Sequence, residues 1–157
     1  MSMIRAVAPQ QVTWILEHSV VVAASKAFVW AWRSDISTWH DPPAQFELDG
    51  PFVSGARGRT FMPGQAPLAW TLTEVREGES FVAEIALEDA TALFEWRFDA
   101  IDDRHTRMTQ RIGVSGSNAQ AFVEQVRAGF GGTLAEGMAR LADSIENAAR
   151  ERDARPD

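Results

Sequence analysis

The sequence predicts an α+β domain in which an antiparallel sheet closes around one long helix. Three observations predict it. An alternating strand stands near the start of the chain, strand-like sequence fills positions 45–114, and one long amphipathic helix follows. Because a curved sheet with a single long helix to cover it encloses space, this order of elements indicates a container. It is more informative about architecture than about chemistry.

The composition is that of an ordinary globular domain. A chain of 157 residues fits a single-domain length and can bury a core without disulfides. We expect residues 1–157 to form one domain, with 1–11 and 151–157 as loose termini. The sequence contains no cysteine, which excludes disulfides and thiolate metal sites and is typical of a reducing compartment. We therefore expect a cytoplasmic protein.

Charge and hydropathy argue against several partners. The net charge is −7, whereas nucleic-acid binding needs a basic face. No segment approaches the roughly 20 apolar residues of a membrane span, and the N-terminus lacks the apolar run of a signal peptide. The three histidines have no metal-ligand spacing, and no phosphate-binding loop is present. We expect neither metal nor cofactor, and the oligomeric state, monomer or dimer, stays open.

Local patterns predict the first strand and the short helices after it. Residues 12–24 (VTWILEHSVVVAA) are apolar and β-branched, which predicts a strand. Ser25 predicts a helix N-cap, and Asp35 caps a second short helix that ends before Pro42. Strict alternation along the strand would place on one face Trp14, Leu16, His18, Val20 and Val22.

Six short alternating runs follow and predict an antiparallel meander. They are QFEL, GRTFM, LAWTLTEV, SFVAEIAL, ATALFEWRF and HTRMTQRIGV. The apolar faces of the last two runs carry Phe94, Trp96, Phe98, Met108, Gln110 and Ile112. The inward register of residues 68–76 stays open between two sets: Trp70, Leu72 and Glu74, or Thr71, Thr73 and Val75.

The segment from Asn118 to about Arg150 has the pattern of a long amphipathic helix, with Asn118 as its N-cap. Its apolar stripe is Phe122, Val126, Phe130, Leu134, Met138, Leu141 and Ile145. Glycines at 129, 131, 132 and 137 are costly inside a helix. Two interpretations stay open: a helix that bends or lets a ligand approach its backbone, or a break across 129–132. We expect weaker hydrogen-exchange protection at 129–137 than at 141–145.

Local motifs add a family resemblance to this order of elements. They are Val22-x-Ala24, Val29-Trp30, Ser34-Asp35 and Trp39, and then Trp70-Thr71-Leu72-Thr73-Glu74-Val75 before a glycine-containing turn. With these motifs the chain resembles the START/Bet v 1-like (SRPBCC) superfamily, especially its bacterial polyketide cyclase/dehydrase-like branch, over nearly its whole length. The resemblance implies a helix-grip fold, in which a curved seven-stranded antiparallel sheet encloses a cavity with a long C-terminal helix. Arg33 departs from the pattern, because an aliphatic residue is expected there.

The resemblance implies binding of a hydrophobic or amphipathic small molecule, such as a lipid, quinone or polyketide, in that cavity. Face assignments give the expected ligand-binding residues: Trp39, Phe61, Trp70, Phe94, Trp96, Phe98, Met108, Gln110, Phe122, Phe130, Leu134 and Arg33. Each aromatic is also compatible with a plain packed core. Arg33 or Arg59 would receive a ligand carboxylate, or else is a solvated surface arginine. His18 is the candidate general base, or else a satisfied core histidine.

Two other functions stay open, and the sequence does not decide whether the protein is an enzyme. A polyketide cyclase, aromatase or dehydratase would fold a poly-keto chain inside the cavity, but no convincing acid–base pair shares one face. A co-chaperone-like interaction module would need a small, filled cavity and an exposed apolar patch.

Overall fold

The structure is a computed structural model that describes residues 11–39 and 41–154. Its elements in chain order are β1 (Thr13–Val22), α1 (Lys26–Arg33), η1 (Ile36–Thr38), β2 (Gln45–Leu48), β3 (Arg57–Phe61), β4 (Leu68–Arg76), β5 (Ser80–Leu87), β6 (Ala90–Asp102), β7 (His105–Ser115), η2 (Ala119–Phe122), α2 (Val123–Phe130) and α3 (Leu134–Ala154). The strands form one seven-stranded sheet in the order β1-β7-β6-β5-β4-β3-β2. Every neighbouring pair is antiparallel, as the meander predicts.

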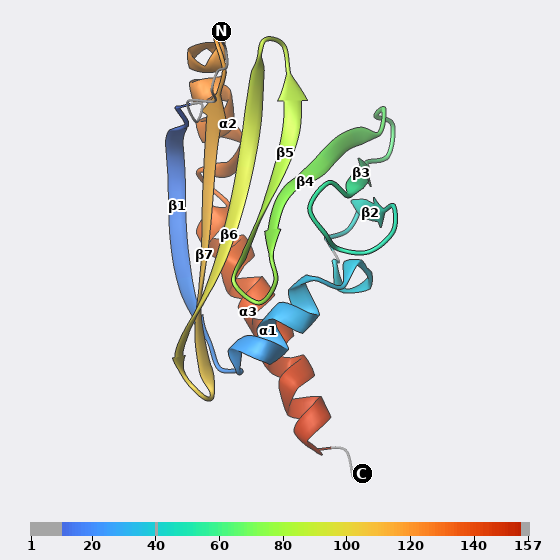
Figure 1. The fold of residues 1–157 in the computed structure, drawn as a ribbon, viewed down its shortest axis with the longest axis vertical. Helices are drawn as coiled ribbons and strands as arrows, with labels where there is room; N and C mark the ends of the chain where they lie inside the picture. Colours follow the sequence, from blue (N-terminus) through green and yellow to red (C-terminus); the bar gives the residue numbers. More distant parts are fainter. Residues whose placement is uncertain (1–10, 40, 155–157) are drawn as a thin grey trace, which may run out of the picture.

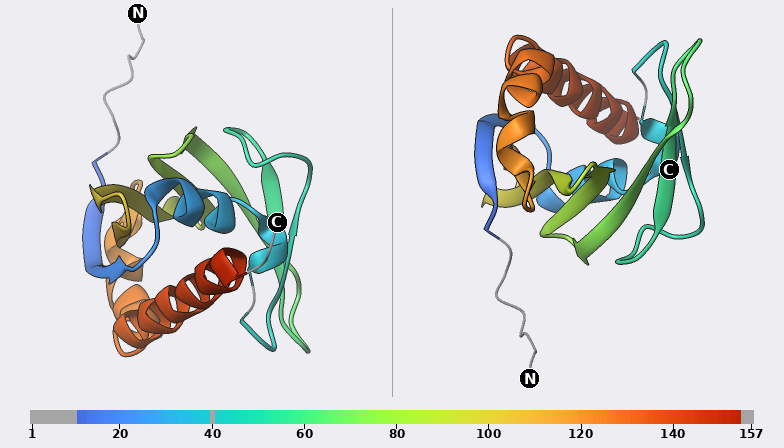
Figure 2. Two further views of the ribbon diagram at one scale, coloured as in Figure 1. Left: turned by 90° about the horizontal axis from the view of Figure 1, so that it is seen from below. Right: turned by 90° about the horizontal axis from the view of Figure 1, so that it is seen from above.

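The sheet curves strongly and the helices lie on its concave side. Figure 1 shows β1 beside β7, with α3 behind the long strands and α1 across their lower end. Seen along the strands, α3 crosses the open side of the curved sheet (Figure 2). This is the helix-grip architecture that the sequence predicts, with two short helices, α1 and η1, after the first strand.

A bulge in β1 overturns the predicted face of one tryptophan. Leu16 pairs with Ile112, but Trp14 pairs with Gly113, because the register shifts between Trp14 and Leu16. Trp14 therefore lies on the outer face, where its ring contacts the Arg111 guanidinium at 3.8 Å. Gly113 makes room for the ring, since an added Cβ would lie 2.8 Å from Trp14 Cε3.

A second bulge settles the open register of β4. The register shifts between Leu72 and Glu74, so neither strict alternation holds along the strand. Trp70 and Leu72 are buried on the concave face, and Val75 packs against the same core. Glu74 is exposed. The carboxylate of Glu74 therefore does not face the interior.

The C-terminal segment is broken rather than continuous, which decides between the two interpretations. Helix α2 ends at Phe130, a turn occupies 131–133, and α3 begins at Leu134. The break lies slightly beyond the expected 129–132. The long helix is thus α3 alone, and the residues around the turn are free to contribute to the wall of a cavity.

The predicted N-cap before α1 is confirmed, whereas Asn118 stands at the predicted cap position, before η2, without capping that helix through its side chain. Ser25 Oγ accepts a hydrogen bond from the Phe28 N–H at 3.1 Å. Asn118 makes no side-chain cap; its Nδ2 donates to the Glu88 carbonyl at 3.1 Å and ties the segment to the β5–β6 turn. The predicted loose termini lie outside the described residues, except that 11 is described and α3 stays helical through Ala154.

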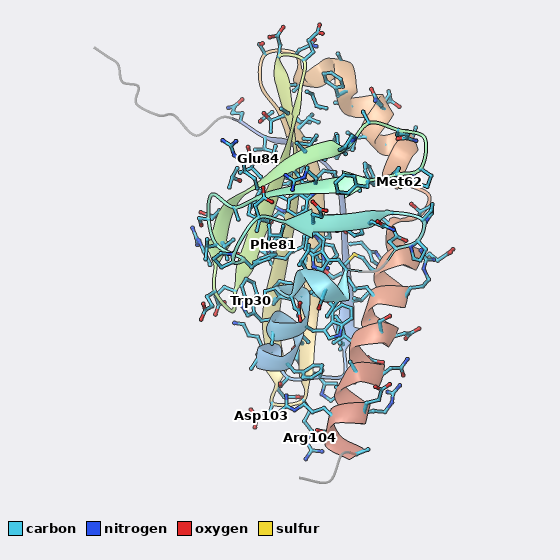
Figure 3. All side chains as sticks on the ribbon, turned by 90° about the vertical axis from the view of Figure 1, so that its right-hand side faces the viewer. Trp30, Met62, Phe81, Glu84, Asp103 and Arg104 are labelled. Atoms are coloured by element: carbon cyan, nitrogen blue, oxygen red, sulfur yellow. The ribbon has the colours of Figure 1, made fainter. Side chains whose placement is uncertain are left out.

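Two apolar clusters join the helices to the sheet. In Figure 3, Trp30 and Phe81 lie in the interior between the strands and the helices. The larger cluster contains Val22, Val29, Trp70, Leu72, Phe81, Trp96, Phe98, Met108, Met138 and Ile145. The smaller one contains Ile112, Val114, Val123 and Val126 and packs α2 on β7. Several members of the larger cluster also face an internal cavity, which is the candidate site.

Candidate ligand-binding cavity

A cavity of about 770 Å³ lies between the concave face of the sheet and the helices. Almost every element contributes to its wall. The lining residues are Trp32, Arg33, Thr38, Trp39, Asp41, Pro42, Phe46, Thr60, Trp70, Phe81, Ala83, Ile85, Phe94, Trp96, Gln110, Gly129, Phe130, Thr133, Leu134, Gly137, Met138, Arg140, Leu141 and Ser144. The size is in the range of small-molecule sites.

The structure brings most of the predicted ligand-binding residues together in this wall. Those that line the cavity are Arg33, Trp39, Trp70, Phe94, Trp96, Gln110, Phe130 and Leu134. The other four, Phe61, Phe98, Met108 and Phe122, do not line it. A ligand-binding role for the first group remains a prediction.

Phe61 lies on the wrong face of β3 for a lining residue. It pairs with Gln45, while Gly58 pairs with the inward Trp70. Because faces alternate, Phe61 shares the outer face with Arg59. Arg59 forms ion pairs there with carboxylates of β2 and the following turn, Glu47 and Asp49, each at 2.9 Å. These partners raise the pKa of Arg59 and place it away from the cavity.

The other three belong to the packed clusters instead. Phe98 and Met108 are fully buried, and Trp30 of α1 meets Phe98 with ring centres 5.7 Å apart. Phe122, the last residue of η2, packs on the smaller cluster. His18, the candidate base, is paired with Gln110 on the concave face but is not among the lining residues.

Sequence reasoning missed several lining residues on β2, β3 and β5. Alternation in SFVAEIAL contains the signal for three of them, since Phe81, Ala83 and Ile85 share one face and all line the cavity. No comparable signal marks Phe46 or Thr60, because β2 and β3 are too short for alternation to identify the inner face.

Hydrogen bonds fix two tryptophans as flat walls. Trp39 Nε1 donates to the Arg33 carbonyl oxygen at 2.8 Å, and Trp70 Nε1 donates to Thr60 Oγ1 at 3.0 Å. The two rings stack with centres 5.5 Å apart and planes inclined by 18°. Because both ring N–H groups are already satisfied, these indoles present apolar surface to the cavity.

Arg33, the last residue of α1, is the unusual group of the site. Its guanidinium carbon lies 4.7 Å from the centre of the Trp39 ring and 4.4 Å from that of Trp96. Among the described residues, its Nε is the one fully covered side-chain nitrogen or oxygen without a hydrogen-bond partner. Burial lowers the pKa of Arg33 to about 9, because the charged form is desolvated, yet the group remains protonated at neutral pH.

The other charged lining residues are exposed. Asp41 lies at the rim, and Arg140 forms an ion pair with Glu136 at 2.7 Å.

The described part of the chain contains no cluster of three or more potential metal ligands among His, Cys, Asp and Glu. Within residues 11–39 and 41–154, no helix has the length and apolar character needed to cross a membrane.

Fold and cavity together define a helix-grip protein, with an apolar chamber between a curved sheet and a long helix. The sequence identifies the family within this fold. Residues 13–146 match the family described as polyketide cyclase / dehydrase and lipid transport, and the chain belongs to that family. Comparison with the sequences of curated proteins gives no match.

Solved structures with the same fold come from plants and bacteria. Norcoclaurine synthase from Thalictrum flavum is 16% identical with a TM-score of 0.64, covering 92% of this chain and 97% of that one. The aromatase/cyclase Zhui from Streptomyces sp. R1128 is 16% identical with a TM-score of 0.61, covering 90% and 96%. A protein from Thermobifida fusca is 24% identical with a TM-score of 0.65, covering 84% and 93%. At these identities the likeness concerns the fold alone.

Proposed function

We propose that the protein binds a hydrophobic or amphipathic small molecule in the cavity. The observation that carries the proposal is the cavity itself, about 770 Å³ with a wall formed mainly by aromatic and aliphatic side chains. A space of this size favours a ligand site over an interaction module with a filled core. The family description, which includes lipid transport, supports the same function. A cytoplasmic, bacterial setting remains part of the proposal.

Affinity would come from apolar burial. At roughly 25 cal/mol per Å², a ligand that buries about 300 Å² of apolar surface gains about 7 kcal/mol. Part of this gain is lost to immobilisation, which depends on how rigid the site already is. The hydrogen-bonded indoles of Trp39 and Trp70 are fixed before binding, so little ordering of the wall is needed.

Titration with N-phenyl-1-naphthylamine, an uncharged fluorescent probe, tests the proposal. We expect saturable binding to the wild-type protein with 1:1 stoichiometry. Ala83→Phe fills part of the cavity and should weaken binding at least tenfold. Ala86→Phe is the matched control, because Ala86 lies on the same strand but is exposed on the outer face. No saturable binding, or equal binding by both variants, would refute the proposal.

A cyclisation or dehydration enzyme is the second candidate. A buried cation facing an apolar cavity favours it, because such a group stabilises an enolate-like oxyanion. Among the described lining residues, however, no histidine or buried carboxylate accompanies Arg33 to move a proton. Incubation with a linear poly-keto thioester, followed by mass spectrometry for loss of water, distinguishes turnover from binding.

A further inference from the structure

Arg33 is a charged side chain held inside the protein without a counter-ion among residues 11–39 and 41–154. It is only 7% exposed, and no described residue accepts a hydrogen bond from its guanidinium. Buried charges in proteins are normally paired, because removing an ion from water is costly. An isolated guanidinium in the wall of a cavity therefore marks a place where an acceptor is expected to bind.

The aromatic rings around Arg33 explain how the charge is tolerated but leave its donors unused. Trp39 and Trp96 lie close enough for cation–π attraction, at 4.7 and 4.4 Å, and Phe81 follows at 5.7 Å. Ring faces accept no strong hydrogen bond, so the N–H groups of the guanidinium lack a strong acceptor. An anion in the cavity would supply both the charge and the acceptors.

The charge of the wall points to a monoanion. Arg140, the other lining arginine, is exposed and already paired with Glu136. Asp41 adds a negative charge at the rim. A phosphate would bring a second negative charge with no cation to match it. A carboxylate brings one charge, and its two oxygens match the planar fork of a guanidinium.

The remaining wall describes the rest of the ligand. Gln110 pairs across the strands with Trp96, lines the cavity, and has no side-chain hydrogen bond among the described residues. Its side-chain amide can form a hydrogen bond with a second polar atom of the ligand, near the anionic end. Trp70, Phe94 and Phe130 offer apolar surface to the ligand body.

From these contacts we infer that the ligand is an amphipathic monocarboxylate whose carboxylate pairs with Arg33 inside the cavity. The inference rests on the proposed function, since it concerns the same cavity. It narrows the ligand from hydrophobic molecules in general to acids with an aromatic or long apolar body. Neutral lipids and alcohols of the same shape would bind more weakly.

Matched acids and alcohols test the inference on the wild-type protein. Decanoate and decanol, and 2-naphthoate and 2-naphthalenemethanol, are compared by displacement of N-phenyl-1-naphthylamine at pH 7.5. A charge-assisted hydrogen bond to a buried partner predicts that each acid binds about 10–100-fold more tightly than its alcohol. Equal affinities would overturn the inference and leave the proposed function intact, whereas failure of the probe to bind would overturn the proposed function itself.

Two substitutions assign the preference to Arg33. Arg33→Met should abolish the preference for each acid over its matched alcohol, and Arg33→Lys should retain part of that preference. Arg97→Met is the charge-matched control, because Arg97 follows Trp96 in the chain but is exposed on the outer face. A preference that survives in Arg33→Met would overturn the assignment.

A spectroscopic measurement keeps the inference testable if Arg33→Met does not fold. The Nε–Hε signal of Arg33 is followed by ¹⁵N NMR in the wild-type protein during titration with 2-naphthoate and with the alcohol. We expect a large shift with the acid and a small one with the alcohol. An Arg33 signal that does not respond to bound 2-naphthoate would overturn the inference.

Discussion

The indole of Trp39 holds Arg33 at two points. Its Nε1 donates a 2.8 Å hydrogen bond to the Arg33 carbonyl oxygen, and its ring centre lies 4.7 Å from the guanidinium carbon of the same residue. The end of α1 and the charge that it carries into the cavity are therefore positioned by one side chain. Because Trp39 also stacks on Trp70, the arrangement links α1 to the far strands of the sheet.

Trp39→Phe should destabilise the protein by about 1–2 kcal/mol, because it loses the hydrogen bond and part of the buried ring. Urea unfolding followed by circular dichroism measures the change. Trp32→Phe is the comparison, since Trp32 also lines the cavity but its ring nitrogen has no partner among the described residues. Equal losses in the two variants would show that the Trp39 hydrogen bond contributes nothing.

Arg33→Met should stabilise the ligand-free protein by about 1–2 kcal/mol. The substitution removes the desolvation cost of an unpaired charge, and the lost cation–π contacts with Trp39 and Trp96 offset only part of this gain. Chemical denaturation of protein freed of ligand by organic extraction is the measurement. A clear destabilisation would mean that the aromatic contacts outweigh the cost of burial.

Gly58→Ala and Gly129→Ala should have opposite effects. An added Cβ at Gly58 would lie 2.3 Å from Trp70 Cη2, so the indole must move, at a cost of about 1–3 kcal/mol. At Gly129 an added Cβ meets nothing within 4 Å, and the helix gains about 0.5–1 kcal/mol. Thermal unfolding of both variants tests the pair. Destabilisation by Gly129→Ala would argue against an ordinary helical environment at that position.

Hydrogen exchange should divide the C-terminal helices at the turn. Residues 129–137 flank the break after Phe130 and are mostly exposed, so their amides should exchange through local opening. Amides of 141–145 lie within α3, where Ala142 and Ile145 are buried, and should exchange near the rate of global unfolding. Mass spectrometry of peptic fragments resolves the two segments, and equal protection would contradict the expected local opening.

The pKa of Asp49 should lie below its ordinary value in the folded protein, because Arg59 hydrogen-bonds to its carboxylate and attracts its charge. A depressed folded-state pKa gives a stabilisation that is present above the ordinary pKa of about 3.9 and is lost as the pH falls through the folded value. NMR titration of the Asp49 carboxyl carbon measures it. In Arg59→Met the pKa should return toward 3.9; no change would exclude Arg59 as the cause.

Most of the fold was predictable because local sequence patterns mark where each strand and helix lies, and the order of these elements is typical of one fold. Alternation and turn residues located all the strands, and glycines in the last segment signalled a possible break. The face of Trp14 was predicted wrongly because one extra residue enters β1. A second bulge decides the face of Glu74 in β4, which alternation left open. Nothing in the alternation of apolar residues reveals where a bulge lies.

The site was predictable in outline for a different reason. Aromatic residues on inward faces were correctly placed near a cavity, but separating wall from core requires knowing what covers each strand. Phe94 faces open space, whereas Phe98, four residues along the same strand, lies under Trp30 of α1. The unpaired state of Arg33 is a property of its surroundings, which come from distant parts of the chain, and no motif encodes it.

The pairing of β1 with β7 has a consequence for the growing chain. β1 is an edge strand that pairs, within the described part of the chain, with β7 alone, and Thr13 lies opposite Val114. During synthesis β1, which is apolar and β-branched, therefore has no strand to pair with until residues 105–115 have emerged. The pairing is slow, because it must close the long loop between Val22 and His105. In a chain that stops before His105, the backbone N–H and C=O groups of β1 would lack the β7 partner. We expect such fragments to aggregate through this unpaired strand.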